Sequence, residues 1–207
     1  MRDLKVARRD FLALGLTGAG ALVAYGLLRE KADAAPILRP PGAQDEEEFV
    51  ARCLRCQECV RSCLTQCLEP AGKEYGTGKL WTPRLNPALA KCEFELCGRA
   101  CAESCPVGAI RKPPDEEVVI GTAAVNRAKC IAWNEGKACL VCYERCSYAA
   151  IETDARGRPR VIADKCVGCG ACQNTCVTCP DPAIVVYPAG NAPPEGGGGG
   201  GGRRGNG

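Results

Sequence analysis

The sequence predicts a small α+β protein with little regular secondary structure, organised as two similar modules in tandem. Three observations lead to this prediction. The 207 residues include 18 cysteines, and most of these fall into four tight runs. The runs recur with a nearly constant period, because their first cysteines are 39, 38 and 36 residues apart, at Cys53, Cys92, Cys130 and Cys166. Only three Phe, two Trp and one Met are present, so we expect metal-ligand bonds to replace part of the usual core.

A fixed period indicates one supersecondary unit that has been duplicated. We expect each unit to contain a cysteine loop, a short helix that starts near the fourth cysteine, and a β-strand that carries Ile or Val. Three runs close on a similar segment, at residues 105–110, 146–151 and 179–184. The predicted segments are an N-terminal signal helix (1–34), a linker (35–48), a first module (49–124), a second module (125–188) and a disordered glycine-rich tail (189–207).

The last cysteine run has the most specific spacing. Cys166, Cys169, Cys172 and Cys176 follow the pattern C-x2-C-x2-C-x3-C. Bacterial ferredoxins use this pattern to hold [4Fe-4S] clusters, and the fourth cysteine ligates the other cluster of a pair. A zinc site would need only two of these closely spaced thiols, and disulfides cannot join such near neighbours without strain. The spacing therefore predicts ferredoxin-like dicluster modules.

The other three runs have different loop lengths, but each can supply three ligands to one cluster and a fourth to its neighbour. Exchange of the fourth cysteine within adjacent pairs of runs predicts four [4Fe-4S] clusters. The predicted ligand sets are Cys53/Cys56/Cys59/Cys105, Cys92/Cys97/Cys101/Cys63, Cys130/Cys139/Cys142/Cys176 and Cys166/Cys169/Cys172/Cys146.

Two cysteines, Cys67 and Cys179, are left outside these sets. We predict that both are buried and inert, as free cysteines often are. The alternatives are that one of them replaces a neighbouring fourth ligand, or that it forms a disulfide. Cys179 is the stronger rival, because it lies three residues after Cys176 and directly before Pro180.

The composition excludes several classes of function. The chain has no histidine, which excludes c-type haem attachment, Rieske centres and histidine-based acid-base catalysis. We see no nucleophile-base pair or nucleotide-binding loop, so we predict that the protein is not an enzyme. The formal charge is +3, but bound clusters would make the loaded protein acidic. Nucleic-acid binding therefore receives no support.

The N-terminus contains an export signal. The residues Arg8-Arg9-Asp10-Phe11-Leu12 match a twin-arginine signal, and an apolar run extends to Leu28. Ala32-Asp33-Ala34 is a plausible cleavage site. The twin-arginine route carries folded proteins, which suits a cofactor inserted before export, and so predicts a periplasmic protein. An uncleaved signal helix that keeps the protein at the membrane is the alternative, because the apolar run is of borderline length.

The segments between the cysteine runs give weaker signals. Residues 36–42 are rich in proline and predict an extended linker. The acidic stretch at 45–48 predicts the first turn of a short helix. Residues 118–120, Val-Val-Ile, predict a strand. We expect Trp81 to pack locally within its loop.

Several features besides the cysteine spacing carry a resemblance to a known family. They are the twin-arginine signal, residues 38–43 (Leu-Arg-Pro-Pro-Gly-Ala) with 51–56 (Ala-Arg-Cys-Leu-Arg-Cys), the loop 80–83 (Leu-Trp-Thr-Pro), and the run from Cys130 to Cys142. Over roughly residues 1–188, the chain resembles the NapG/MauM family of ferredoxin-type proteins. It departs from the family at Leu64 and Ser147, where a proline often follows the fourth cysteine.

The resemblance implies a periplasmic protein with four [4Fe-4S] clusters that relays electrons. The implied donor is a membrane-bound quinol dehydrogenase subunit of the NapH type, and the implied acceptor is a periplasmic reductase such as nitrate reductase. Two alternatives stay open. One is an accessory or maturation ferredoxin for another periplasmic redox enzyme, as the likeness to MauM implies. The other is the electron-transfer subunit of a molybdopterin oxidoreductase.

Overall fold

The computed structural model describes residues 36–189 and residue 191. The predicted signal helix, and all of the predicted tail except residues 189 and 191, lie outside the described residues. The described part contains short helices and short strands, and its longest helix, α2 (Glu46–Arg52), has seven residues. This confirms the prediction of a mixed fold with little regular secondary structure. None of the helices in this part is long and apolar enough to cross a membrane.

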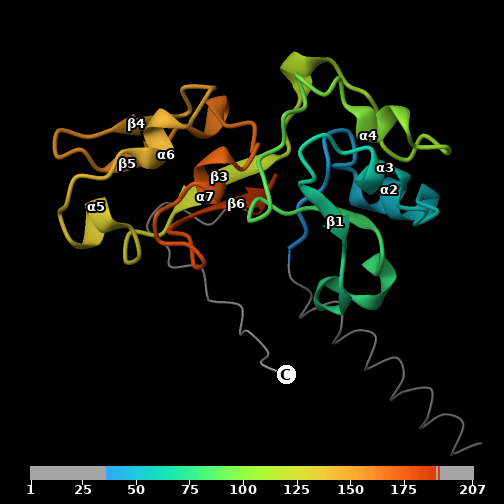
Figure 1. Ribbon diagram of the computed structural model, residues 1–207, viewed down its shortest axis with the longest axis horizontal. Helices are drawn as coiled ribbons and strands as arrows, with labels where there is room; N and C mark the ends of the chain where they lie inside the picture. Colours follow the sequence, from blue (N-terminus) through green and yellow to red (C-terminus); the bar gives the residue numbers. More distant parts are fainter. Residues whose placement is uncertain (1–35, 190, 192–207) are drawn as a thin grey trace, which may run out of the picture.

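Figure 1 shows two lobes that are joined in the middle of the molecule. The first half of the chain forms one lobe with α2, α3 (Glu58–Arg61), β1 (Leu68–Pro70), β2 (Pro83–Leu85) and α4 (Ala100–Glu103). The second half forms the other with α5 (Ile131–Asn134), α6 (Val141–Glu144), β4 (Ile151–Thr153), β5 (Pro159–Val161), α7 (Ala171–Asn174) and β6 (Ile184–Pro188). Strand β3 (Gly121–Val125) runs between the lobes. Within residues 36–189, four short 3-10 helices lie in the connections, at Lys73–Tyr75, Thr77–Lys79, Asp115–Glu117 and Ala163–Lys165.

The described strands form three two-stranded antiparallel sheets, β1-β2, β3-β6 and β4-β5. The β3-β6 sheet is the longest, with Gly121 opposite Pro188 and Val125 opposite Ile184. Because β6 closes the last cysteine run, β3 belongs spatially with the second half of the chain. The boundary that the sequence predicted between residues 124 and 125 therefore falls inside a strand.

The sequence predicted a strand at residues 118–120, but in the structure the strand β3 starts only at Gly121. A 3-10 turn at Asp115–Glu117 directly precedes these residues. The backbone of Ile120 then donates to the Val167 carbonyl at 2.9 Å. This bond attaches the segment to the last cysteine loop, so its backbone does not join a sheet there.

The short helix of each repeat lies earlier than the sequence predicted. It contains the third cysteine of the run and ends before the fourth, as for Cys59 in α3 and Cys172 in α7. Left-handed residues, Gln57 and Gly170, begin these two helices, with φ of 67° and 85°. The reversal of the backbone there folds the loop of the first three cysteines back on itself. A strand follows in three of the repeats, β1, β4 and β6.

The segment predicted as a linker is packed into the protein. Arg39 is only 3% exposed, and its guanidinium makes a bidentate ion pair with Glu46 at 2.6 and 2.7 Å. It also donates to the Thr82 hydroxyl at 2.9 Å and to the Pro83 carbonyl at 2.7 Å. The segment therefore ties α2 to the β2 strand. The predicted acidic helix is confirmed, and its N-cap Asp45 accepts a bond from the Glu48 backbone.

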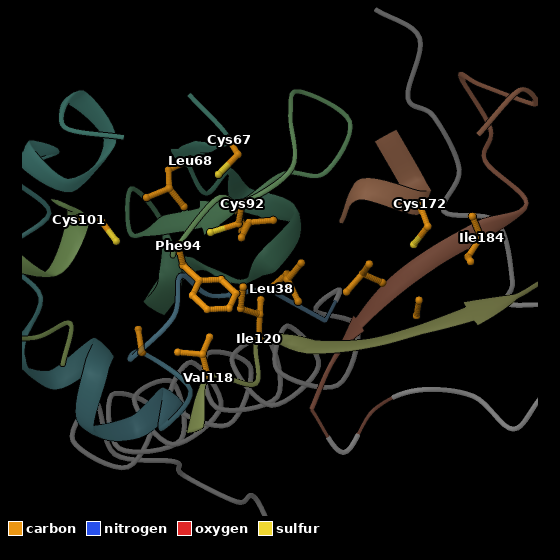
Figure 2. Packing of buried hydrophobic residues seen from close by; sticks show 14 of the residues in the cluster. Leu38, Cys67, Leu68, Cys92, Phe94, Cys101, Val118, Ile120, Cys172 and Ile184 are labelled. Atoms are coloured by element: carbon orange, nitrogen blue, oxygen red, sulfur yellow. The ribbon is translucent and has the colours of Figure 1, made fainter. Parts of the chain in front are cut away.

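One apolar cluster extends through both lobes and includes many of the thiols. Figure 2 shows Leu38, Phe94, Val118 and Ile120, which belong to this cluster, below Cys92. Three Phe are too few for a conventional core, and buried cysteines fill the remaining space. The expectation for Trp81 is wrong, because its side chain is 58% exposed.

We predict that Arg39→Met destabilises the iron-loaded protein by about 3 kcal/mol, because it leaves Glu46 and Thr82 without their buried partner. Anaerobic urea denaturation, followed by circular dichroism at a fixed incubation time, measures the effect. The control is Arg61→Met, which removes an exposed pair with Glu58 and should cost under about 1 kcal/mol. Equal effects of the two substitutions would contradict the role given to Arg39.

Candidate iron-sulfur sites

The structure brings the sixteen predicted ligands into four groups, which we number in chain order of their first cysteine. Site 1 is Cys53, Cys56, Cys59 and Cys105; site 2 is Cys92, Cys97, Cys101 and Cys63; site 3 is Cys130, Cys139, Cys142 and Cys176; site 4 is Cys166, Cys169, Cys172 and Cys146. None of the 18 cysteines forms a disulfide, and all lie within the described residues.

At site 1, the three cysteines of the first run face the fourth cysteine of the second run. Burial, followed by the nearby thiols of Cys53, Cys105 and Cys56, raises the pKa of Cys59 to about 12. The α3 and α4 helices, which carry Cys59 and Cys101, pack against each other. Ser62 and Ser104, which follow these helices, share a hydrogen bond of 2.7 Å. This paired arrangement places each fourth cysteine beside the neighbouring run.

Site 2 has the converse arrangement, with three cysteines of the second run and the fourth cysteine of the first run. Burial, followed by Cys97, Cys59 and Cys63, raises the pKa of Cys101 to about 12. Cys67 interacts with both Cys63 and Cys92, so the thiols of Cys63 and Cys92 lie against the same buried cysteine. The influence of Cys59 on Cys101 also shows that sites 1 and 2 are neighbours.

Sites 3 and 4 each line a small apolar pocket. The four thiols of site 3 line one pocket together with Val125, Val141 and Ile184. The four thiols of site 4 line the other together with Tyr148, Ile151 and Val167. Burial, followed by Cys130, Cys139 and Cys176, raises the pKa of Cys142 to about 12. The pKa of Cys172 is raised in the same way by burial and by the other thiols of site 4, with Cys142 of site 3 also contributing.

Backbone amides point at several of the sulfurs. Ala109 donates to the Sγ of Cys105 at 3.2 Å, Ala150 to Cys146 at 3.3 Å, and Ala123 to Cys166 at 3.4 Å. Burial opposes ionisation of Cys105, but the amides of residues 107–110 together outweigh it and lower its pKa. Such amide bonds stabilise thiolates and are among the factors that set cluster potentials. Four groups of four thiols, with amide donors and apolar walls, fit [4Fe-4S] clusters.

A single metal ion fits less well. No group of three or more His, Cys, Asp or Glu side chains in the described part of the chain is arranged to hold one ion. A cubane cluster makes a different demand, because each thiolate binds a different iron and the four sulfurs surround the cluster. The thiols of sites 3 and 4 are arranged in this way around their pockets.

The two lobes meet between sites 2 and 4. The backbone of Cys92 donates to the Cys169 carbonyl at 2.8 Å. The rings of Phe94 and Tyr148 stack beside this bond with centroids 6.1 Å apart. Lys91 lies close enough to Cys169 to favour its thiolate. The four sites therefore follow one another in the spatial order 1, 2, 4, 3.

The structure separates Cys179 from Cys176. Cys176 lines the site 3 pocket and is hydrogen-bonded to the Thr178 hydroxyl at 3.2 Å. Cys179 is exposed, and its sulfur faces the carbonyls of Gln173 and Asn174 at 3.8 and 4.0 Å. The expectation that Cys179 is buried is therefore wrong. The reason is that residues 177–182 form an extra loop between the fourth cysteine and β6.

Sequence reasoning missed the position that Cys67 occupies in the repeat. Cys67 is 1% exposed, as expected for a buried thiol. It is followed by Leu68, and the pair Cys67-Leu68 corresponds to buried Ala-Ile pairs in the other repeats, at 109–110, 150–151 and 183–184. The spacing from the fourth cysteine to this pair is the same in the first three runs, and this alignment could have revealed the correspondence.

We predict that Cys176→Ala lowers the iron content of the anaerobically purified protein by about one cluster, or about four irons. Cys179→Ala, as the matched control, should leave the iron content unchanged, because its thiol points away from the site 3 pocket. Colorimetric iron determination against protein concentration measures both. The reverse result, with iron lost only in Cys179→Ala, would contradict the assignment of Cys176.

Comparison with known proteins gives relatives along most of the chain. The chain is 36% identical over 192 residues to the methylamine utilization ferredoxin-type protein MauM of Methylorubrum extorquens, covering 83% of this chain and 84% of the relative. It is 34% identical over 202 residues to the ferredoxin-type protein NapG of Escherichia coli, covering 87% and 85%. MauM of Paracoccus denitrificans is 32% identical and covers 84% of both chains.

No family model and no solved structure matches the chain. The curated relatives nevertheless agree with one another in being ferredoxin-type proteins, and the aligned region includes most of each of them. The name that they share agrees with the four groups of thiols. The chain belongs to the NapG/MauM family of ferredoxin-type proteins.

Proposed function

We propose that this protein relays electrons along four [4Fe-4S] clusters, one at each of sites 1 to 4, and catalyses no bond chemistry itself. The observation that carries the proposal is the continuous arrangement of four groups of four thiols across two lobes. Sites 1 and 2 are linked through Cys59 and Cys101, sites 2 and 4 through Cys92 and Cys169, and sites 4 and 3 through Cys172 and Cys142. An arrangement without gaps suits single-electron transfer from end to end.

A [4Fe-4S] cluster supplies reversible one-electron chemistry when it is bound. The residues of the chain have three roles in this proposal. The thiolates hold the iron, the amides of residues such as Ala109 and Ala150 stabilise the negative sulfurs, and apolar walls exclude water. Lys91, which lies near Cys169, adds positive charge at the junction between the lobes.

The two ends of the line present exposed apolar side chains. At site 1, Leu54 lies between two ligands and is 65% exposed. Trp81 is also exposed, and its backbone carbonyl accepts a hydrogen bond of 2.6 Å from the side chain of Gln57, which belongs to the same cysteine run as Leu54. At site 3, Val177 follows Cys176 and is 55% exposed. We propose that partner proteins dock at these two ends, because a relay needs one partner at each end.

We propose further that the protein is periplasmic and is exported by the twin-arginine route. The proposed donor is a membrane-bound quinol dehydrogenase of the NapH type, and the proposed acceptor is a periplasmic nitrate reductase. The NapG relatives and the signal sequence support this assignment. MauM relatives of similar identity support a second candidate, an accessory ferredoxin for methylamine utilization. The order of the cysteine spacings gives less support to a subunit of a molybdopterin oxidoreductase.

We predict that the loaded protein contains four centres that reduce reversibly within the potential range between quinol and the acceptor. Anaerobic potentiometric titration, followed by electron paramagnetic resonance, measures this. If no centre reduces in that range, the clusters do not relay electrons between these partners.

A reconstitution assay separates the two candidate partners. Membranes and periplasm from a source strain without this gene should lose quinol-dependent nitrate reduction, and the added loaded protein should restore it. Cys172→Ala interrupts the line at site 4 and should fail to restore activity, whereas Cys179→Ala should restore it fully. Normal nitrate reduction in the deletion strain, with impaired methylamine oxidation, would favour the accessory role.

A further inference from the structure

Cys67 is the one thiol outside the four sites that lies against a proposed ligand. Its sulfur is 3.6 Å from the Sγ of Cys63, and it also interacts with Cys92. Figure 2 shows Cys67 and Cys92 with their sulfurs directed into the same region of the core. Both contacts are with ligands proposed for site 2.

The repeat shows that Cys67 is not needed to complete a ligand set. The other repeats place Ala109, Ala150 and Ala183 at this position, each buried and each followed by a buried Ile. The backbone amide of Cys67 points at the sulfur of Cys63, as the amide of Ala109 does at Cys105. The backbone of Cys67 therefore has the role common to the repeats, and only its side chain is new.

The protonation states of the two sulfurs decide which of them donates the hydrogen bond. An iron-bound Cys63 is a thiolate and has no proton, so it can only accept a hydrogen bond. Cys67 is buried in apolar surroundings, which disfavours its thiolate and keeps the S-H bond available. The 3.6 Å separation lies within the range of a hydrogen bond between sulfur atoms. Cys67 is then the donor.

A donor at a ligand sulfur changes the balance between the oxidised and reduced cluster. The reduced cluster carries one more negative charge and gains more from the bond, so the bond raises the reduction potential. We propose that Cys67 is a potential-setting residue of site 2, which donates an S-H hydrogen bond to Cys63 and makes this site easier to reduce. This inference rests on the proposed function, because it requires a cluster at site 2.

The site that Cys67 modifies is the second in the line. Site 2 lies next to site 1 through Cys101 and Cys59, and next to site 4 through the hydrogen bond from Cys92 to Cys169. A raised potential there favours the presence of the electron at the boundary between the lobes. No other repeat has a cysteine at this position, so the effect is confined to one of the four sites.

The experiment compares the wild type with Cys67→Ala, Cys67→Ser and the control Cys179→Ala, all purified anaerobically with their iron. Cys67→Ala should fold, because alanine occupies the same position in the other repeats. Potentiometric titration followed by electron paramagnetic resonance should show one midpoint potential lowered, with about a tenfold change in the ratio of oxidised to reduced cluster, or about 59 mV for one electron. The other three potentials and the iron content should stay unchanged.

Cys67→Ser keeps a donor and should recover part of the lost potential, and Cys179→Ala should change nothing. Loss of about four irons in Cys67→Ala would overturn the inference, because Cys67 would then be a ligand. Four unchanged potentials in Cys67→Ala would also overturn it. A wild type without reducible clusters would instead refute the proposed function, so the two failures are distinguishable.

Discussion

Burial of like-charged sulfurs is the constraint on which the rest of this structure depends. Burial and neighbouring thiols raise the pKa values of Cys59, Cys101 and Cys142 to about 12, so these groups are protonated near neutral pH when no cation is present. Iron binding must displace these protons and compensate the sulfur charges, because metal ligands bind as thiolates. Under the proposed function, positively charged iron compensates these sulfurs, and its bonds replace part of the apolar core that the few large side chains cannot supply.

The repeat solves this problem in a similar way four times. A left-handed residue precedes the short helix in three of the runs, at Gln57, Arg99 and Gly170, whereas Leu140 in the third run has φ of -118°. In each run three thiols lie close together, and the fourth lies beside the neighbouring run. The amides that follow the fourth cysteine then stabilise its sulfur, as Ala109 and Ala150 do. The pairing of runs gives two lobes, and the bond from Cys92 to Cys169 joins them.

The sequence predicted the mixed fold from the cysteine spacing, which reports directly on local geometry, and the family from the segments that flank the cysteine runs. The exchange rule pairs the same thiols that lie near one another in the structure, and the ligand sets stay a prediction. Burial of the 36–42 segment was not predictable, since it depends on the distant partners Thr82 and Pro83 of Arg39. The pairing of β3 with β6 is likewise a long-range contact. Cys179 was expected to be buried because free cysteines often are, but the loop at 177–182 places it at the surface.

The most direct test of this account is the iron and acid-labile sulfide content of the anaerobically purified full-length protein, measured together with its disulfides. Four cubane clusters predict about sixteen irons and about sixteen sulfides per chain, with no disulfide. A clearly lower iron content, with the cysteines joined in disulfides, would contradict the account. The cysteine runs would then form a covalent scaffold, and the buried thiol groups would have no part in electron transfer.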